Sequence, residues 1–213
     1  MRYSSNLTRG ILISCVVVLW SFSSVFAQDG SVTEDVLHGP SVPFAGNPKA
    51  DITVVEFFDY NCGYCMRAFS DIKSLLRQDN EIRFVFRDFP VLSEDSILAA
   101  RWALAAHKQG RYLPMHAMLM SYHGQKDEKT LSQMAQKLGL DVKKMQEDVQ
   151  APDIDQTLHE INAVGRSLGI TGTPAFLIGE TLYPGYIGEK GLKEAITAER
   201  AKLRKREWMK SRE

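Results

Sequence analysis

Cysteine is scarce in this chain of 213 residues, which contains only Cys15, Cys62 and Cys65. The sequence also has no excess of either charge, with 26 basic and 26 acidic residues. This balance gives no indication of binding to nucleic acid or to a membrane surface. With 44% hydrophobic and 24% charged residues, the composition is that of an ordinary globular protein rather than a disordered one.

The N-terminal segment has the layout of a secretory signal peptide. Arg2 and Arg9 precede the apolar run 11–20, and small and polar residues follow up to Ala27. We therefore expect cleavage after Ala27 and export of the protein, which leaves 24 basic against 26 acidic residues and a net charge of −2. An uncleaved membrane anchor is less favoured, because serines interrupt the apolar run. Lipid attachment at Cys15 is less favoured still, because Arg9 leaves too short an apolar stretch before it.

Cys62 and Cys65 are the two cysteines that remain after cleavage, in an oxidising compartment. The stabilisation that a disulfide provides grows with the length of the loop it closes, and three residues close almost no loop. The spacing therefore favours a pair that opens and closes. A zinc site is the less favoured alternative, because structural zinc usually takes four ligands and the sequence has no second cysteine pair and no suitably spaced histidines. We expect neither a metal nor another cofactor.

The residues around the cysteine pair predict a strand, a helix and a second strand. β-Branched and aromatic residues at 52–59 indicate a strand that is covered on both faces. Apolar residues then recur at helical spacing, with Asn61 as the expected N-cap, Cys65 on the buried side and Cys62 at the N-terminal end. A second strand at 82–86 completes a right-handed unit of two parallel strands.

The rest of the chain is predicted to be mostly helical. Apolar stripes separated by glycine and proline predict about five helices between 93 and 168, packed as a subdomain. Two short strands flank Gly179 and Glu180, which is the pattern of a two-residue hairpin. A charged amphipathic helix is expected from Glu189 to about Trp208.

This order of elements predicts an α/β protein, a thioredoxin fold with an inserted α-helical subdomain. The sequence resembles the DsbA-like family of exported thiol:disulfide oxidoreductases. The resemblance covers nearly all of the chain after the signal peptide. Besides the inserted helices, the matched residues are Glu56, six positions before the first cysteine, the motif Cys62-Gly63-Tyr64-Cys65, and Thr173-Pro174.

The predicted organisation has five segments. They are a signal peptide at 1–27, an N-terminal lead-in at 28–50, the first half of the thioredoxin fold at 51–92, the helical insertion at 93–168 and the second half at 169–213.

The chemistry of the two cysteines follows from their predicted places on the helix. A sulfur at a helix N-terminus meets unpaired N–H groups and the positive end of the helix dipole, which favour the thiolate, so we expect Cys62 to be the nucleophile. Cys65, one turn later and buried, is placed to resolve a mixed disulfide. An unpaired charge on Glu56 inside an apolar strand would be costly, and this carboxylate is expected to accept a proton from Cys65. The alternative is that Glu56 faces a solvated edge or pairs with a lysine.

The resemblance implies two further features of the site. The peptide bond before Pro174 is expected to be cis and to lie beside the cysteines. The backbone of Thr173 is expected to pair with an extended substrate chain, as an added strand does.

The direction of electron flow is less well determined by the sequence. Gly63-Tyr64 replaces the Pro-His pair of the strongly oxidising members, and tyrosine cannot stabilise a thiolate as a cation, so a milder oxidant is expected. The Gly-Tyr pair and Thr173 are similar to the exported isomerase branch. Those isomerases are oligomers held by an added N-terminal region, whereas only the short lead-in precedes the first strand here. This favours a monomer and hence a dithiol oxidase.

The leading hypothesis is therefore a periplasmic enzyme that introduces disulfides into cysteine-containing exported proteins and works with a membrane redox partner. The alternative is an isomerase or reductase that a membrane partner keeps reduced. A non-enzymatic metal-binding or surface protein is a more remote alternative.

Overall fold

The computed structural model describes residues 34–39 and 41–212. The predicted signal peptide, its cleavage site after Ala27 and Cys15 lie outside these residues. Within the described part of the chain, no helix combines the length and the apolar character needed to span a membrane.

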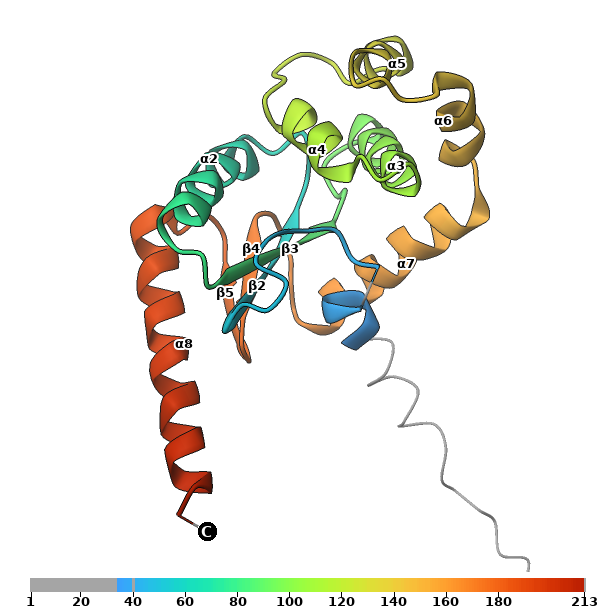
Figure 1. Cartoon of the computed structure of the whole chain (residues 1–213). Helices are drawn as coiled ribbons and strands as arrows, with labels where there is room; N and C mark the ends of the chain where they lie inside the picture. The colour runs from blue at the N-terminus through green and yellow to red at the C-terminus, as the bar shows by residue number, and fades with distance from the viewer. Residues whose placement is uncertain (1–33, 40, 213) are drawn as a thin grey trace, which may run out of the picture.

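A five-stranded sheet forms the centre of the fold (Figure 1). In spatial order, its strands are β1 (Phe44–Gly46), β3 (Ile82–Asp88), β2 (Ile52–Phe58), β4 (Ala175–Ile178) and β5 (Thr181–Pro184). β2 lies in the middle, parallel to β3 and antiparallel to β4. Six of its seven residues are buried, which confirms the prediction of a strand covered on both faces.

Helix α2 (Gly63–Gln78) joins β2 to β3 and completes the predicted parallel unit. Its buried residues are Cys65, Ala68, Phe69, Ile72 and Leu75. The prediction of Asn61 as the N-cap is wrong, because Cys62 holds that position and its carbonyl accepts the hydrogen bond from the Met66 N–H.

The sheet has helices on both faces, and each face contributes to a separate core. The α2 face of the sheet includes Val54 and Phe58 of β2 and packs against α2, α8 (Gly188–Lys210) and helices of the insertion. The α7 face includes Val55 and Phe57 and packs against α7 (Pro152–Ser167) and the residues before β1. Alternation along β2 thus directs successive side chains into the two cores.

The segment 93–168 contains the predicted number of helices, but they do not all belong to one bundle. Helices α3 (Glu94–Lys108), α4 (Tyr112–Met120), α5 (Glu128–Lys137) and α6 (Val142–Val149) group together beyond one end of the sheet, whereas α7 runs back along it (Figure 1). The second half of α7 buries Ile161 and Val164 against the α7 face. The first half of α7 still packs with the insertion, through Ile154 and ion pairs from α3 to Asp153 and Asp155, so the prediction is refined only for the second half of α7, which covers the sheet.

The segments at the two edges of the sheet complete the fold. β1, inside the lead-in, was not predicted, and it pairs antiparallel with β3. The predicted hairpin is confirmed: β4 and β5 pair across Gly179 and Glu180, and Gly179 takes a φ of 57° that favours glycine.

Candidate active site

Cys62 lies where the carboxyl end of β2 leads into the start of α2. The N–H groups of the first turn are unpaired by the helix itself and face this position. The pKa of the Cys62 thiol is lowered to about 6, first by a hydrogen bond with the Cys65 side chain and also by the Thr173 side chain and the backbone N–H groups of Cys65 and Tyr64, while burial opposes the change. The thiol is thus largely a thiolate at neutral pH.

Cys65 has the opposite environment, one turn further along α2. Its side chain is fully buried, and burial is the main reason that its pKa is raised, followed by the hydrogen bond with Cys62 and the nearby Glu56 carboxylate. The two thiols are both free. One sulfur is therefore poised as an anion and the other is held as a protonated thiol.

Glu56 is buried in β2 on the α2 face, and neither of its carboxylate oxygens has a hydrogen-bond partner among the described residues. Burial raises its pKa to about 8, and the Cys62 charge adds to the effect. The two alternatives to this placement, a solvated edge or pairing with a lysine, are both wrong.

The loop before β4 lies against the nucleophile. The Thr173–Pro174 peptide bond is cis, as expected. When protonated, the Cys62 thiol donates a hydrogen bond of 3.3 Å to the Thr173 carbonyl. Ala175, the next residue after Pro174, pairs with Phe57 near the end of β2, which explains why this loop and the start of α2 meet.

The dipeptide between the cysteines faces outward. A side chain at Gly63 would meet no atom within 4 Å, and Tyr64 is 57% exposed. The Tyr64 ring stacks on Tyr186 at 5.9 Å between centroids, and the Tyr186 hydroxyl donates to Asp71. Tyr186 was not predicted as a site residue, because it lies 122 positions from Tyr64 in the chain. The turn between β5 and α8 brings it beside the motif.

A polar network that the sequence analysis also missed fixes the turn before Cys62. Asp59 is buried and accepts hydrogen bonds from the Asn61 N–H at 2.7 Å and the Ser96 hydroxyl at 2.7 Å. The Asn61 side chain accepts a 3.1 Å hydrogen bond from Lys126, which is 1% exposed. This explains why Asn61 does not cap the helix: its side chain connects the turn to the insertion instead.

Beneath α2, the insertion contributes a buried histidine. His116 lies 3.0 Å from the Tyr60 hydroxyl through Nδ1 and stacks on Tyr112. Burial lowers its pKa to about 3, so the ring is neutral. Tyr112 in turn donates to Asp88, whose pKa burial raises to about 7.

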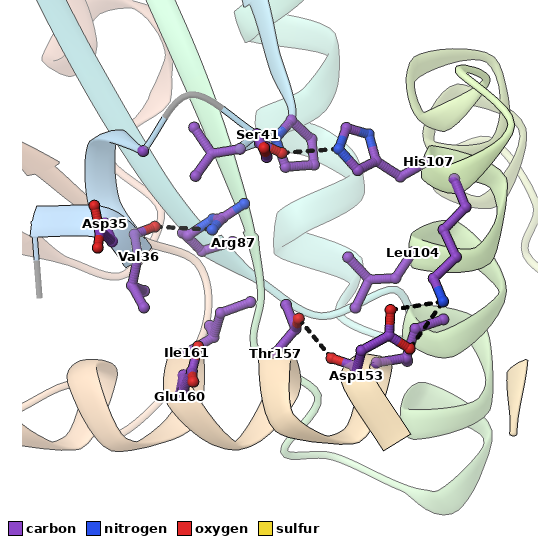
Figure 2. Close-up of a pocket in the computed structure, with 15 residues that line it drawn as sticks. Asp35, Val36, Ser41, Arg87, Leu104, His107, Asp153, Thr157, Glu160 and Ile161 are labelled. Atoms are coloured by element: carbon purple, nitrogen blue, oxygen red, sulfur yellow. Dashed lines mark hydrogen bonds and ion pairs between the residues drawn. The ribbon is translucent and has the colours of Figure 1, made fainter. Parts of the chain in front are cut away.

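A cavity of about 600 Å³ opens on the α7 face, away from the cysteines (Figure 2). Its lining includes apolar side chains such as Leu104 and Ile161 and the buried Arg87. Arg87 donates to the Val36 carbonyl at 2.8 Å, as Figure 2 shows, and to its neighbour Phe86. These bonds tie the residues before β1 to the sheet, and the cavity contains none of the expected site residues.

Among the described residues, no group of three or more His, Cys, Asp or Glu side chains is arranged to hold a metal ion.

A family model described as thioredoxin matches residues 40–198. This chain belongs to the thioredoxin family. The match spans the sheet, the cysteine pair, the cis-proline loop and the inserted helices, so the predicted fold class is confirmed.

Similar solved structures place this thioredoxin-family chain among the DsbA-like proteins. A thioredoxin-like oxidoreductase from Silicibacter pomeroyi is 40% identical, with a TM-score of 0.75 over 78% of this chain and 97% of that one. The thiol-disulfide exchange protein alpha-DsbA2 from Wolbachia pipientis is 27% identical, with a TM-score of 0.72 over 81% and 97%. A periplasmic thioredoxin-like protein from Salmonella enterica is also 27% identical, with a TM-score of 0.68 over 80% and 97%. The resemblance stated from the sequence is thus confirmed.

In the curated relatives, the region that matches this chain is a small part of a much longer protein. The Na(+)/H(+) antiporter NhaA 1 of Salinispora arenicola is 30% identical over 164 residues, which are 72% of this chain but only 24% of the antiporter. This thioredoxin-family chain spans about a quarter of the length of the curated relatives that it matches.

Proposed function

We propose that this chain is an exported thiol:disulfide oxidoreductase that acts as a dithiol oxidase on cysteine-containing exported proteins, here called clients. The proposal rests on the contrast in pKa between two cysteine thiols that lie one helical turn apart. Cys62 has a pKa lowered to about 6, whereas burial raises the pKa of Cys65. A stable Cys62 thiolate is a good leaving group, which favours the release of an oxidised client.

The reaction starts from a Cys62–Cys65 disulfide. A client thiolate attacks Sγ of Cys62, the bond to Cys65 breaks, and Cys65 leaves as a thiolate that takes up a proton. A second client thiolate then attacks the client sulfur of the mixed disulfide, which forms the client disulfide and releases Cys62 as a thiolate. Two electrons have then passed to the cysteine pair, and a membrane redox partner accepts them to regenerate the disulfide.

Glu56 is proposed to donate a proton to Cys65 and to accept one from it. A protonated Glu56, favoured by its raised pKa of about 8, can supply a proton when Cys65 leaves as a thiolate. During regeneration the Cys65 thiol must be deprotonated before it attacks, and ionised Glu56 then accepts that proton. A carboxyl group with a pKa near the working pH suits both directions.

Thr173 and Pro174 are proposed to bind the client backbone. In the described part of the chain, the Thr173 N–H makes no hydrogen bond, while its carbonyl accepts only from Cys62. An extended client segment can therefore pair with this residue at the edge of the site. Tyr64 and Tyr186 provide an exposed aromatic surface next to it.

An isomerase or reductase that a membrane partner keeps reduced is the second candidate, since the Gly63-Tyr64 pair lacks the histidine that favours strong oxidation. In that case the Cys62 thiolate attacks a client disulfide. The two candidates differ in oligomeric state as well, because we propose that the oxidase is a monomer.

The test compares two reactions of the chain from residue 28 onward. We expect faster oxidation of a reduced client by the disulfide form than refolding of a scrambled client by the dithiol form. The equilibrium constant with glutathione should place the pair on the oxidising side of thioredoxin, because the thiolate stabilises the reduced form. Strong scrambled-client activity from an oligomer would instead establish the isomerase.

Two variants separate the roles of the sulfurs. Cys62→Ser should lower both reactions to the uncatalysed rate, whereas Cys65→Ser should still form a mixed disulfide with a client that has a disulfide. Unchanged exchange by Cys62→Ser would overturn the proposed function as a whole.

Export to the periplasm is part of the proposal. Expression of the full chain in a bacterium should yield a periplasmic product that begins at Gln28, as measured by mass spectrometry. A product that retains residues 1–27 in the membrane would instead establish an anchor.

A further inference from the structure

Helix α8 continues past the residues that the thioredoxin family model matches. The family match ends at residue 198, but α8 continues to Lys210. Its first half packs against the sheet through Leu192, Ala195 and Ile196, and Leu203 still contacts that core. The last turns project away from the fold, toward the C-terminus (Figure 1).

One side of this projecting part has an unusual composition, and we call it the basic–aromatic face. It consists of Arg204, Lys205, Trp208, Met209 and Arg212. Arg204, Lys205, Trp208 and Met209 are linked by spacings of one, three and four positions, which places them on one side of α8. Arg212 follows just after the end of the helix. Trp208 is 57% and Met209 46% exposed. Glu207, three positions after Arg204, borders the face.

Two arginines of α8 that face the fold are neutralised, in contrast to the basic residues of the basic–aromatic face. Arg200 pairs with Asp51 and Asp79, and Arg206 with Glu180. Within the described part of the chain, Arg204, Lys205 and Arg212 make no ion pair, and Arg212 lies over the Trp208 ring at 4.7 Å. Positive charge and exposed apolar surface thus coincide on the side turned away from the fold.

We propose that the basic–aromatic face is a peripheral docking site for a membrane surface that contains anionic lipids. Basic side chains attract such a surface, and Trp favours the interface between headgroups and acyl chains. The net charge of the whole chain gives no indication of this site, because acidic residues elsewhere balance the local excess of basic residues.

Other occupants fit the face less well. Pairing with the same face of a second copy would bring Arg204 and Lys205 against like charges. A polyanion alone would explain the basic residues but not the exposed Trp208 and Met209 between them. The docking does not depend on the thiol chemistry, so the two proposals can fail separately.

The chain itself supplies a fluorescent reporter. In the chain from residue 28 onward, the tryptophans are Trp102 and Trp208, and Trp102 is 1% exposed. Vesicles of equal parts phosphatidylglycerol and phosphatidylcholine should shift the Trp208 emission to the blue and sediment the protein. Pure phosphatidylcholine vesicles should do neither, and about 0.5 M salt should weaken the binding through screening.

Matched variants test whether the face itself binds. Lys205→Glu lies on the face and Lys210→Glu on the other side of the same turns, and both change the charge equally. We expect Lys205→Glu to weaken vesicle binding at least about fivefold and Lys210→Glu by about twofold or less. Trp208→Ala should weaken binding to a similar extent as Lys205→Glu, and all three variants should retain thiol exchange.

Several results would overturn the docking site. They are equal losses from Lys205→Glu and Lys210→Glu, an unchanged Trp208 emission in anionic vesicles, or equal binding to neutral vesicles. Self-association that Trp208→Ala abolishes, or equally tight binding to heparin, would assign the face to a second copy or to a polyanion instead.

Discussion

The α2 face of the sheet contains two buried acidic residues, Glu56 and Asp88. Each has a carboxylate oxygen without a hydrogen-bond partner among the described residues. The buried His116 packs on the same face, and one of its ring nitrogens also lacks such a partner. The α7 face is lined mainly by apolar side chains such as Val85. Its buried Arg87 donates hydrogen bonds to two backbone carbonyls. The two faces of one sheet therefore differ in what they bury: the α2 face contains acidic groups and a histidine with unpartnered atoms, whereas the α7 face is mainly apolar and has Arg83 Nε as its unpartnered atom among the described residues.

This contrast indicates that one face mainly supplies stability and the other supplies the chemistry. A buried polar group without a partner destabilises the fold. On the α2 face, the same loss of solvent raises the pKa of Glu56 and of Cys65, which lies above it on α2. On the α7 face the Nε of Arg83 also lacks a partner, but the rest of this face is mainly apolar and lies away from the cysteines. We therefore assign to it the larger share of the stability that compensates for the active site.

The largest expected effect comes from removing apolar contacts on each face. Ile161→Ala on the α7 face and Ile72→Ala in α2 should each lower the free energy of unfolding by about 2–5 kcal/mol. Only Ile72→Ala should also change the pKa of Cys62, because α2 carries both cysteines. Urea unfolding and the thiolate absorbance measure the two quantities. An altered Cys62 pKa in Ile161→Ala would contradict the division between the faces.

The second prediction concerns the pH dependence that Glu56 introduces. Its pKa is raised from 4.5 to about 8 on folding, so the folded protein retains a proton that the unfolded chain loses, and stability falls as the pH rises through this window. In a Cys62→Ala background, where the thiolate is absent, Glu56→Gln should remove this fall. The gain near pH 8 should reach a few kcal/mol, since one pKa unit corresponds to ~1.36 kcal/mol.

The control for this variant is Glu199→Gln. Glu199 is buried too, but it forms an ion pair with Lys202. Loss of that pair should leave the protein equally or less stable at every pH. The contrary outcome is that Glu199→Gln raises the stability as much as Glu56→Gln does. The gain from Glu56→Gln would then not result from the missing partner of Glu56, and the contrast between the two faces would fail.

The smallest expected effect is at the exposed dipeptide. Tyr64→His places a cation beside Cys62 below the histidine pKa, so the Cys62 pKa should fall by up to about one unit and the glutathione equilibrium should become more oxidising. Tyr64 is exposed, so the free energy of unfolding should change by less than about 0.5 kcal/mol. A change in stability without a change in redox equilibrium would show that Tyr64 serves the fold instead.

The parts of the fold that depend on local patterns could be predicted from the sequence. Strand β2, helix α2, the hairpin at Gly179 and the places of Cys62 and Cys65 on their helix follow from periodicity and turn chemistry over a few residues. The cis bond before Pro174 came from the family resemblance, not from local pattern. β1 was missed because a strand of three residues carries too little alternation to detect.

Contacts between distant segments could not be predicted in the same way. The spacing of Ile161 and Val164 shows that α7 is amphipathic, but it does not show whether the partner is a helix of the insertion or the sheet. The interactions of Lys126 with Asn61 and of Tyr186 with Tyr64 depend on the path of the whole chain between them.

The amino-acid order alone is enough to place a pair of cysteines at the start of a helix that follows a buried strand, because hydrophobic periodicity and helix termini are local properties of the chain. How acidic each group is depends on the folded molecule. The pKa values of Cys62, Cys65 and Glu56 depend on how much solvent is excluded and on which charges lie nearby. Both conditions arise only when the insertion, the cis-proline loop and the sheet pack around α2.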